Sequence, residues 1–418
     1  MDPIISCTFV AIRWMSIHLY YYTYFVMKNV LLTVAGIALM GCTQMNQQET
    51  LVLVDVTQDY PEKAIALEFV ADLRLVRFEA PSEEYLFDGV PVVVSESLIV
   101  FHSFQRGDFW VFDGAGKPIS AFNHKGNGPE DYLNLFGVVY DEAAKELFLA
   151  EKNKVKVFDT QGRFKRLLRL PENAWIDQLI NYDAETLLLF DNQQRLHGIY
   201  PAMPPVEGEA YESSFVRISK QDGTLKGYLP APADFEVPLM GKVQMPNGQE
   251  MPVLGTTSRI VAHREGVLLN NPESDTLCLA KGDALRPVWV TTPPIRTQGE
   301  PKRYLNGYVE AGGYRFFEVI SLAKVQRPPL PTAYLAQEIK SGDVICPVLQ
   351  WGDYTGKELH LSPMTIFRSR NARLGHQVLP LDELQEALET GKLKGNLKTL
   401  VEQMGEEEND LLLLMRFQ

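Results

Sequence analysis

The chain has 418 residues, of which 45% are apolar, 22% charged and 10% aromatic, and its formal net charge is −13 at pH 7. This composition excludes a disordered chain, a collagen and a coiled coil, and the length is sufficient for a large core. The acidic chain has no contiguous Lys/Arg block, so it lacks the clustered cations that drive binding to nucleic acid.

Residues 1–41 are predicted to be a signal peptide. Lys28 precedes an apolar run, residues 30–40, that is too short to span a bilayer, which takes about 20 residues. The run ends in Leu39-Met40-Gly41-Cys42, which resembles the lipobox of bacterial lipoproteins. The resemblance implies that signal peptidase recognises Leu39 and Gly41, that cleavage precedes Cys42, and that Cys42 is acylated. A plain secretory signal that happens to contain a cysteine is the alternative.

Residues 1–26 do not fit such a signal, and this favours Met27 as the true start over a membrane-spanning extension. Residues 42–50 are polar and are predicted to be a lipidated tether between the membrane and a domain at 51–418. Because residues 43–46 contain no acidic cluster, we expect a membrane-anchored envelope protein that faces the periplasm rather than the cell surface.

Beyond the tether, short apolar runs rich in β-branched and aromatic residues lie close to Gly, Asn, Asp or Pro, which is typical of β-strands. Their spacing of roughly ten residues favours antiparallel hairpins. These runs include Val92–Val94, Leu98–Phe101, Phe109–Phe112, Val155–Phe158, Leu187–Phe190 and Val267–Leu269. Two Pro-rich stretches, residues 231–255 and 293–333, remain unassigned.

A hairpin pattern recurs along the chain. Val111-Phe112-Asp113 with Gly116-Lys117 is repeated as Val157-Phe158-Asp159 with Gly162-Arg163, and residues 217–224 form a weaker third copy. In each copy a strand ends at a polar residue and Gly supplies the left-handed turn position. A period of about 40–50 residues with several strands per repeat is typical of β-propeller blades, although a generic hairpin gives the same local pattern.

Between the two good copies, residues 125–132 contain Gly126, Gly128, Pro129 and Tyr132. The stretch lacks the third small residue of a phosphate-binding Gly-rich loop, and no strong helix follows it. We interpret it as a rigid loop between blades, with Pro129 favouring an extended Gly128.

These segments, together with Asp275-Thr276-Leu277 and the acidic turn at 406–410, resemble the six-bladed β-propeller lipoproteins with NHL- or TolB-like blades. The resemblance implies an all-β fold of six four-stranded antiparallel blades over residues 51–418. It also implies ring closure between the first and last strands, residues 51–56 and 411–416. Short helices at Asp382–Thr390 and Leu397–Met404 are expected before the closing strand, from their apolar spacing.

Neither a hydrolase, a nucleotide-binding nor a metal motif is present in the sequence. We therefore favour a binding or scaffold module for a peptide, a glycan or an envelope protein, with no catalytic residue and no cofactor. The alternative is a Ca²⁺-assisted hydrolase or lactonase whose metal ligands converge at the propeller axis. The possible contributors, for each of which a role in a turn is the simpler interpretation, are Asp141, Asp191, Asn192 and Asn270.

Two further groups of side chains are open to more than one interpretation. Cys278 and Cys346 could form a disulfide or remain buried thiols, and we favour thiols. A late aromatic group could stack on sugar rings, but packing in the core is the simpler expectation. This group consists of Tyr304, Tyr308, Tyr314, Phe316 and Phe317.

Overall fold

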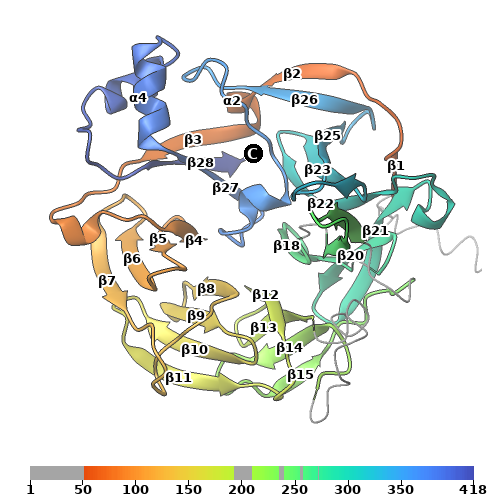
Figure 1. The fold of residues 1–418 in the computed structure, drawn as a ribbon, viewed down its shortest axis with the longest axis horizontal. Helices are drawn as coiled ribbons and strands as arrows, with labels where there is room; N and C mark the ends of the chain where they lie inside the picture. The colour runs from red at the N-terminus through yellow and green to blue at the C-terminus, as the bar shows by residue number, and fades with distance from the viewer. Residues whose placement is uncertain (1–50, 193–209, 235–239, 255–257, 272) are drawn as a thin grey trace, which may run out of the picture. The chain divides into compact units, whose positions relative to one another are not determined.

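Strands dominate the structure, and Figure 1 shows them as sheets arranged in a ring. The computed structural model describes residues 51–192, 210–234, 240–254, 258–271 and 273–418. The predicted signal peptide and tether lie outside the described residues. Six sheets form the blades, which we number along the chain, and a seventh small sheet lies apart from them. The predicted propeller fold is confirmed.

Blades 1 to 3 are regular four-stranded antiparallel sheets. Blade 1 contains β4 (Val90–Val94), β5 (Leu98–His102), β6 (Asp108–Asp113) and β7 (Pro118–Asn123). Blade 2 contains β8 (Gly137–Asp141), β9 (Glu146–Ala150), β10 (Lys154–Asp159) and β11 (Phe164–Arg169). Blade 3 contains β12 (Ile176–Asn181), β13 (Thr186–Asp191), β14 (Phe215–Ser219) and β15 (Leu225–Tyr228). The strand runs predicted in this region all fall within these elements.

Blades 4 and 5 each carry a fifth strand, donated from the start of the described chain. Blade 4 contains β18 (Ile260–His263), β19 (Gly266–Asn270), β20 (Thr276–Lys281) and β21 (Ala284–Thr292), and β1 (Val52–Asp55) pairs in parallel with β21. Blade 5 contains β22 (Arg303–Ala311), β23 (Tyr314–Ser321), β25 (Thr332–Glu338) and β26 (Val344–Gln350), and β2 (Glu62–Ala66) pairs in parallel with β26.

Blade 6 closes the ring with three strands drawn from the two ends of the described chain. β28 (Leu411–Phe417) lies between β27 (Leu374–Leu379) and β3 (Ala71–Val76) and is antiparallel to both. Closure by residues 411–416 is therefore correct, but the expected partner at 51–56 is wrong. That segment is the outer strand β1 of blade 4, where it pairs with β21 and its Leu53 is 60% exposed.

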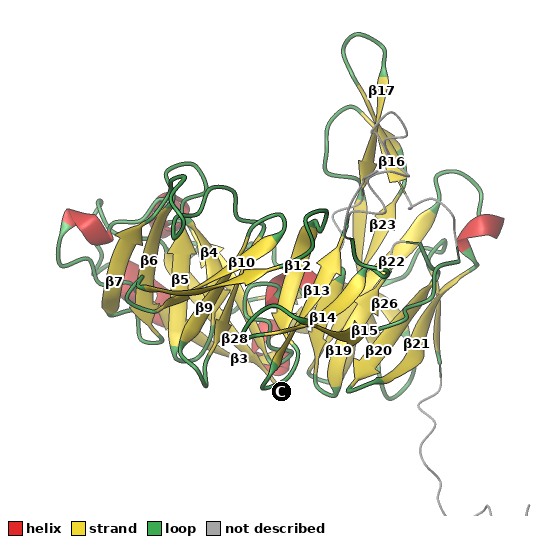
Figure 2. Ribbon diagram, turned by 90° about the horizontal axis from the view of Figure 1, so that it is seen from below, coloured by secondary structure: helices red, strands yellow, loops and turns green. Residues whose placement is uncertain are grey.

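The Pro-rich stretches that the sequence left unassigned also form strands. Besides β22 and β23, they contain β16 (Met240–Gln244), β17 (Glu250–Leu254) and β24 (Lys324–Val325). These three strands make the seventh sheet, in the order β17-β16-β24. Figure 2 shows β16 and β17 projecting beyond the blades.

Helices are few and short among the described residues. The two helices predicted before the closing strand are confirmed as α4 (Leu381–Glu389) and α5 (Gly395–Val401), and they connect β27 to β28. The others are α2 (Leu67–Val70) and the 3-10 turns η1 (Glu83–Tyr85), η2 (Ile295–Thr297) and η3 (Pro363–Ile366). The Ser362 hydroxyl accepts a hydrogen bond from Met364 N and begins η3.

The core lies between neighbouring blades, because successive side chains of a strand point to opposite faces of its sheet. In β28, Leu412 and Leu414 pack toward blade 1, whereas Leu413 and Met415 pack into the cluster shared with blades 4 and 5. Both faces are buried, which explains why the strand is a continuous apolar run instead of an alternating one.

Candidate functional site

The innermost strands of the blades surround a cavity of about 680 Å³ at the axis of the ring. β4, β8, β12 and β18 stand at one end of their sheets and contact one another in sequence. Their side chains and the hairpin turns that follow them line the cavity, among them Val93, Tyr140, Asn181, Asp183 and Ala262. The volume lies within the range of about 300–1,000 Å³ that small-molecule sites occupy.

Blade 6 contributes an irregular segment to this cavity instead of a fourth strand. The segment runs from η3, which contacts β18 and β22, to the start of β27. Arg368, Ser369, Arg370 and Arg373 from this segment line the cavity. Its backbone is fixed to blade 1, because Val94 N donates a hydrogen bond to the Arg368 carbonyl over 3.1 Å.

Two arginines of this segment lie near the same aromatic ring, that of Phe367. The guanidinium carbon of Arg370 lies 3.9 Å from the centre of the Phe367 ring, and that of Arg368 lies 4.9 Å from the same centre. Arg370 has a φ of +50°, which is uncommon for a residue with a side chain. Both arginines are partly exposed, and neither makes an ion pair or a side-chain hydrogen bond within the described part of the chain.

The protein around these two arginines disfavours their positive charge. Burial, with the neighbouring Arg368 charge, lowers the pKa of Arg370 to about 9, and burial also lowers the pKa of Arg368. Both side chains still carry a positive charge at neutral pH. Burial, followed by the Arg368 charge, lowers the pKa of His376 on β27 to about 4, so that this ring is neutral there.

The carboxylates around the cavity are engaged with other groups of the protein. Glu96 pairs with Arg416 over 2.8 Å and with Arg74 over 3.5 Å, and Glu142 accepts a hydrogen bond from Ser97. Glu265 pairs with Arg286 over 3.0 Å. Among the charged side chains of the lining, Arg368, Arg370, Arg373 and Lys281 make no ion pair with any other residue that the structure describes.

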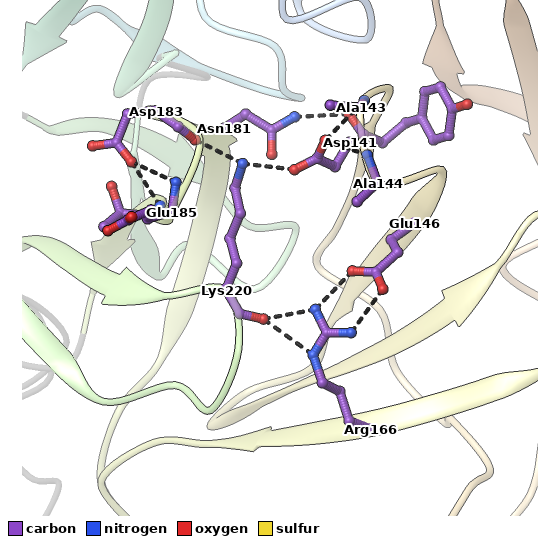
Figure 3. A network of polar contacts seen from close by, with 11 residues as sticks. Asp141, Ala143, Ala144, Glu146, Arg166, Asn181, Asp183, Glu185 and Lys220 are labelled. Carbon is purple, nitrogen blue, oxygen red and sulfur yellow. Dashed lines mark hydrogen bonds and ion pairs between the residues drawn. The ribbon is translucent and has the colours of Figure 1, made fainter.

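A polar network joins blades 2 and 3 beside the cavity (Figure 3). Lys220 Nζ donates to Asp141 Oδ2 and to the Asp183 carbonyl, each over 2.7 Å. Asp141 Oδ1 accepts hydrogen bonds from the backbone N–H groups of Ala143 and Ala144, which close the turn between β8 and β9. Burial raises the pKa of Asp141, but the hydrogen bonds from Lys220 and these amides outweigh it and hold the pKa below its usual value.

The same network extends to the outer strands. Arg166 on β11 binds both carboxylate oxygens of Glu146, over 2.8 and 2.7 Å, and donates to the Lys220 carbonyl over 2.8 Å. The hydrogen bonds from Arg166 lower the pKa of Glu146, against the opposing effect of burial, and Lys165 adds to the lowering. Every charged group of the network has a partner, so the network holds the wall that carries Tyr140, Asn181 and Asp183.

The predicted hairpin residues lie in turns away from the axial cavity. Asp113 Oδ1 accepts hydrogen bonds from Ala115 N and Lys117 N, and Asp159 Oδ1 accepts them from Gln161 N and Arg163 N, each over 2.9 Å. Gly116 and Gly162 have φ values of +91° and +78°, which a residue with a Cβ rarely adopts. The two turns are thus built alike.

The structure places Gly126, Gly128, Pro129 and Tyr132 between blades 1 and 2, also outside the cavity lining. Gly128 N donates to Asp131 Oδ2 over 2.8 Å. The buried Tyr132 hydroxyl donates to the Gly107 carbonyl over 2.7 Å and accepts from His124 N. This loop ties the second and third strands of blade 1 to the start of blade 2.

The residues that we considered as possible calcium ligands contact other protein groups. Asp141 binds Lys220, Asp191 Oδ1 accepts from Trp175 N over 2.6 Å, and Asn270 Nδ2 donates to Asn306 Oδ1 over 3.1 Å. Asn192 is also buried. No group of three or more His, Cys, Asp or Glu side chains suited to a metal ion occurs in the described ranges.

Other predicted features are placed as follows. Cys278 and Cys346 are free thiols in different blades. The late aromatic group is part of the core, with Tyr304, Tyr308, Tyr314, Phe316 and Phe317 all buried.

Leu39, Gly41 and Cys42 lie outside the described residues. Among the residues whose placement is described, no helix is both long and apolar enough to cross a membrane.

Sequence reasoning missed Arg368 and Arg370. A signal was present, since residues 367–373 read FRSRNAR and place three cations within one short segment of an acidic chain. Their position in the cavity could not be read from that pattern, because it depends on the missing fourth strand of blade 6.

The sheets and their axial cavity define the class of protein, a six-bladed β-propeller. Residues 44–235 match the model of the DUF5128 family, which is described as a 6-bladed beta-propeller. No curated protein matches the sequence.

A solved structure shows the same fold, and a second one has a lower TM-score. A protein of Bacteroides fragilis described as exported is 13% identical, with a TM-score of 0.56, over 88% of this chain and 99% of that chain. A DUF4221 family member from Bacteroides vulgatus is 9% identical, with a TM-score of 0.40, over 84% and 97% of the two chains.

Proposed function

We propose that this protein is a lipid-anchored propeller of the bacterial envelope that faces the periplasm and binds a small ligand, such as a glycan or a short peptide, in its axial cavity. The observation that carries the proposal is the pair of unpaired cations, Arg368 and Arg370, on the wall of that cavity. A guanidinium group remains protonated at neutral pH, so it can bind and orient a ligand but is unsuited to act as a general base. Binding is therefore favoured over catalysis.

The cavity limits the size of the ligand. A volume of about 680 Å³ suits a ligand of a few sugar rings or a few amino acids. A protein partner could insert only a short segment there. The turns at the rim come from four different blades, so a ligand would contact several of them at once.

Binding in the cavity can be tested by filling it. Ala372 lines the cavity, and Ala372→Trp should block it, whereas Ala115→Trp adds the same side chain at an exposed turn outside it. Native mass spectrometry of the full chain, extracted in detergent, would be run with short peptides and with oligosaccharides released from envelope fractions. We expect a ligand that binds the wild type and Ala115→Trp but not Ala372→Trp. A ligand retained by Ala372→Trp would show that binding occurs elsewhere.

The lipid anchor is supported by the lipobox sequence and is tested separately. Incorporation of labelled palmitate should be abolished by Cys42→Ser and unchanged by Cys346→Ser, which removes a partly exposed free thiol of the propeller. We also expect Cys42→Ser to release the protein from the membrane fraction. Equal labelling of both variants would contradict acylation at Cys42.

A further inference from the structure

We propose that the ligand of the axial cavity carries an oxyanion group, a carboxylate, sulfate or phosphate, and that Arg368 and Arg370 together bind it. This inference rests on the proposed binding function and specifies the ligand class for the same site. Guanidinium groups bind such anions through short, charge-assisted hydrogen bonds, often two at a time.

The two guanidinium groups lie near one another on one short segment of the cavity wall. Each lies near the Phe367 ring, at 3.9 and 4.9 Å from its centre, so the distance between their carbons cannot exceed the sum of these two values. An oxyanion that reaches both side chains would accept hydrogen bonds from each of them. The ring also restricts the arginines, which reduces the side-chain entropy that binding would otherwise lose.

The pair is unfavourable without a counter-charge. Two like charges lie near each other in a partly desolvated cavity, and the low pKa of Arg370 reflects that environment. The left-handed backbone at Arg370 adds strain, which usually persists at functional positions. An anion in the cavity would compensate both charges at once.

No described carboxylate around the cavity is paired with these two arginines. The acidic side chains of the lining, Glu96, Glu142, Asp183 and Glu265, all contact other groups of the protein. His376 on β27, whose pKa the Arg368 charge helps to lower, is neutral at neutral pH. The Ser369 hydroxyl is bonded to backbone carbonyls of its own segment, and the Asn371 amide could hydrogen-bond the rest of a ligand.

The test measures thermal unfolding of the full chain, extracted in detergent, at increasing sodium sulfate, sodium phosphate or sodium glucuronate, with sodium chloride at matched ionic strength. A ligand that binds only the folded state raises the midpoint temperature. Sulfate and phosphate also stabilise folded proteins without a site, because they are excluded from the surface. We therefore expect at least one oxyanion to raise the midpoint beyond chloride in a saturable way, and to raise it more in the wild type than in a variant that lacks both arginines. No oxyanion effect beyond chloride would overturn the inference.

Variants then locate the effect. Arg368→Gln with Arg370→Asn should lower the affinity at least about tenfold, a change of one decade in Kd. Asparagine is chosen because it tolerates the left-handed conformation. Arg327→Gln, which removes an exposed cation outside the cavity lining, is the matched control and should leave the affinity within about twofold. Unchanged affinity in the double variant would contradict the inference.

Two results separate this inference from the proposed function. Arg368→Lys keeps the charge but loses the planar pair of donors, so it should weaken oxyanion binding less than the double variant. A ligand that is blocked by Ala372→Trp yet binds the double variant normally would preserve the cavity as the binding site and refute the oxyanion. A cavity that binds no ligand would refute both.

Discussion

Two parts of the propeller lie beside the same cavity, and they differ in whether their charged side chains are paired. Between blades 2 and 3, Asp141, Glu146, Arg166 and Lys220 are mutually paired through hydrogen bonds of normal length. In blade 6, Arg368 and Arg370 have no such partners among the described residues. The first group stabilises the ring, because burying a charge is tolerated only when it is paired. The two arginines are available to a ligand. Leaving them unpaired lowers the stability of the fold, and such a loss of stability is typical of functional residues.

The two parts also differ in how they are built. Blades 2 and 3 form from consecutive strands, whereas blade 6 needs β3 from one end of the described chain and β28 from the other. The inner position of blade 6 is left to the segment after η3. Because this segment of blade 6 is not a strand, its side chains in the cavity can vary without changing the strand pairing of the regular blades.

The largest expected effect comes from breaking blade 6. Deleting residues 411–418 removes β28, which pairs with both neighbours and fills two core clusters. We expect the cooperative thermal transition, followed by near-UV circular dichroism, to be lost.

The matched control removes the segment first expected to close the ring. Deleting residues 51–56 takes away an outer strand of blade 4, with its two buried valines, Val54 and Val56. A cooperative transition at a lower midpoint should remain. If both deletions abolished the transition, closure at β3 would not be the decisive contact.

Breaking the polar network should have the next largest effect. Asp141→Ala leaves Lys220 without its buried partner, and such a loss typically costs about 3–5 kcal/mol. Asp159→Ala is a close control, because Asp159 also accepts two amides of its own turn but pairs with the exposed Arg163. An exposed pair contributes about 0–1 kcal/mol. Urea unfolding would measure both, and equal losses would contradict a special role for the buried pair.

The network also predicts a pH dependence. The pKa of Glu146 is lower in the folded chain than its ordinary value of 4.5, chiefly because of Arg166. A lowered carboxyl pKa contributes stability above the unfolded value, and this contribution is lost as the pH falls through the folded pKa. The difference in unfolding free energy between the wild type and Glu146→Gln should therefore be largest near neutral pH and shrink below about pH 4.5.

Urea unfolding at several pH values measures that difference. Glu389→Gln, at an exposed position at the end of α4, provides the control and should differ from the wild type by a small, nearly constant amount. A pH-independent difference for Glu146→Gln would show that its charge does not stabilise the fold.

Local features of the fold could be predicted from the sequence, and long-range ones could not. The turn at Asp113 and Gly116 depends on residues next to each other, so its pattern is visible in the sequence. The pairing of β28 depends on which strand near the start of the described chain lies beside it in the closed ring, and residues 51–56 and 71–76 each contain a strand. The difference appears only in the structure, where 71–76 pairs with β28 and 52–55 pairs with β21.

The candidate site illustrates the same limit. Asp141 was considered as a metal ligand, but its partner Lys220 lies far along the chain and comes from another blade. The arginines of 367–373 form a visible cluster, yet whether they are paired depends on surrounding carboxylates that are distant in sequence. Ion pairing between blades is a property of the closed ring, and a single sequence does not display it.

The smallest expected effect tests whether Arg370 is truly unpaired. Lys145, in the turn after β8, and Arg370 are both non-glycine residues with positive φ, at +54° and +50°. Glycine at either site relieves about 1–2 kcal/mol of backbone strain but increases the entropy of the unfolded chain by about 0.5–1 kcal/mol. Lys145→Gly should therefore raise the unfolding free energy by between about 0 and 1.5 kcal/mol. Arg370→Gly also removes one of two like charges, but it loses the contact with Phe367, which contributes about 0.5–1 kcal/mol. Its effect should therefore lie within about 1 kcal/mol of that of Lys145→Gly. A clearly larger loss of stability in Arg370→Gly, measured by urea unfolding, would mean that the arginine has a further structural partner, and the contrast between the two parts of the cavity wall would fail.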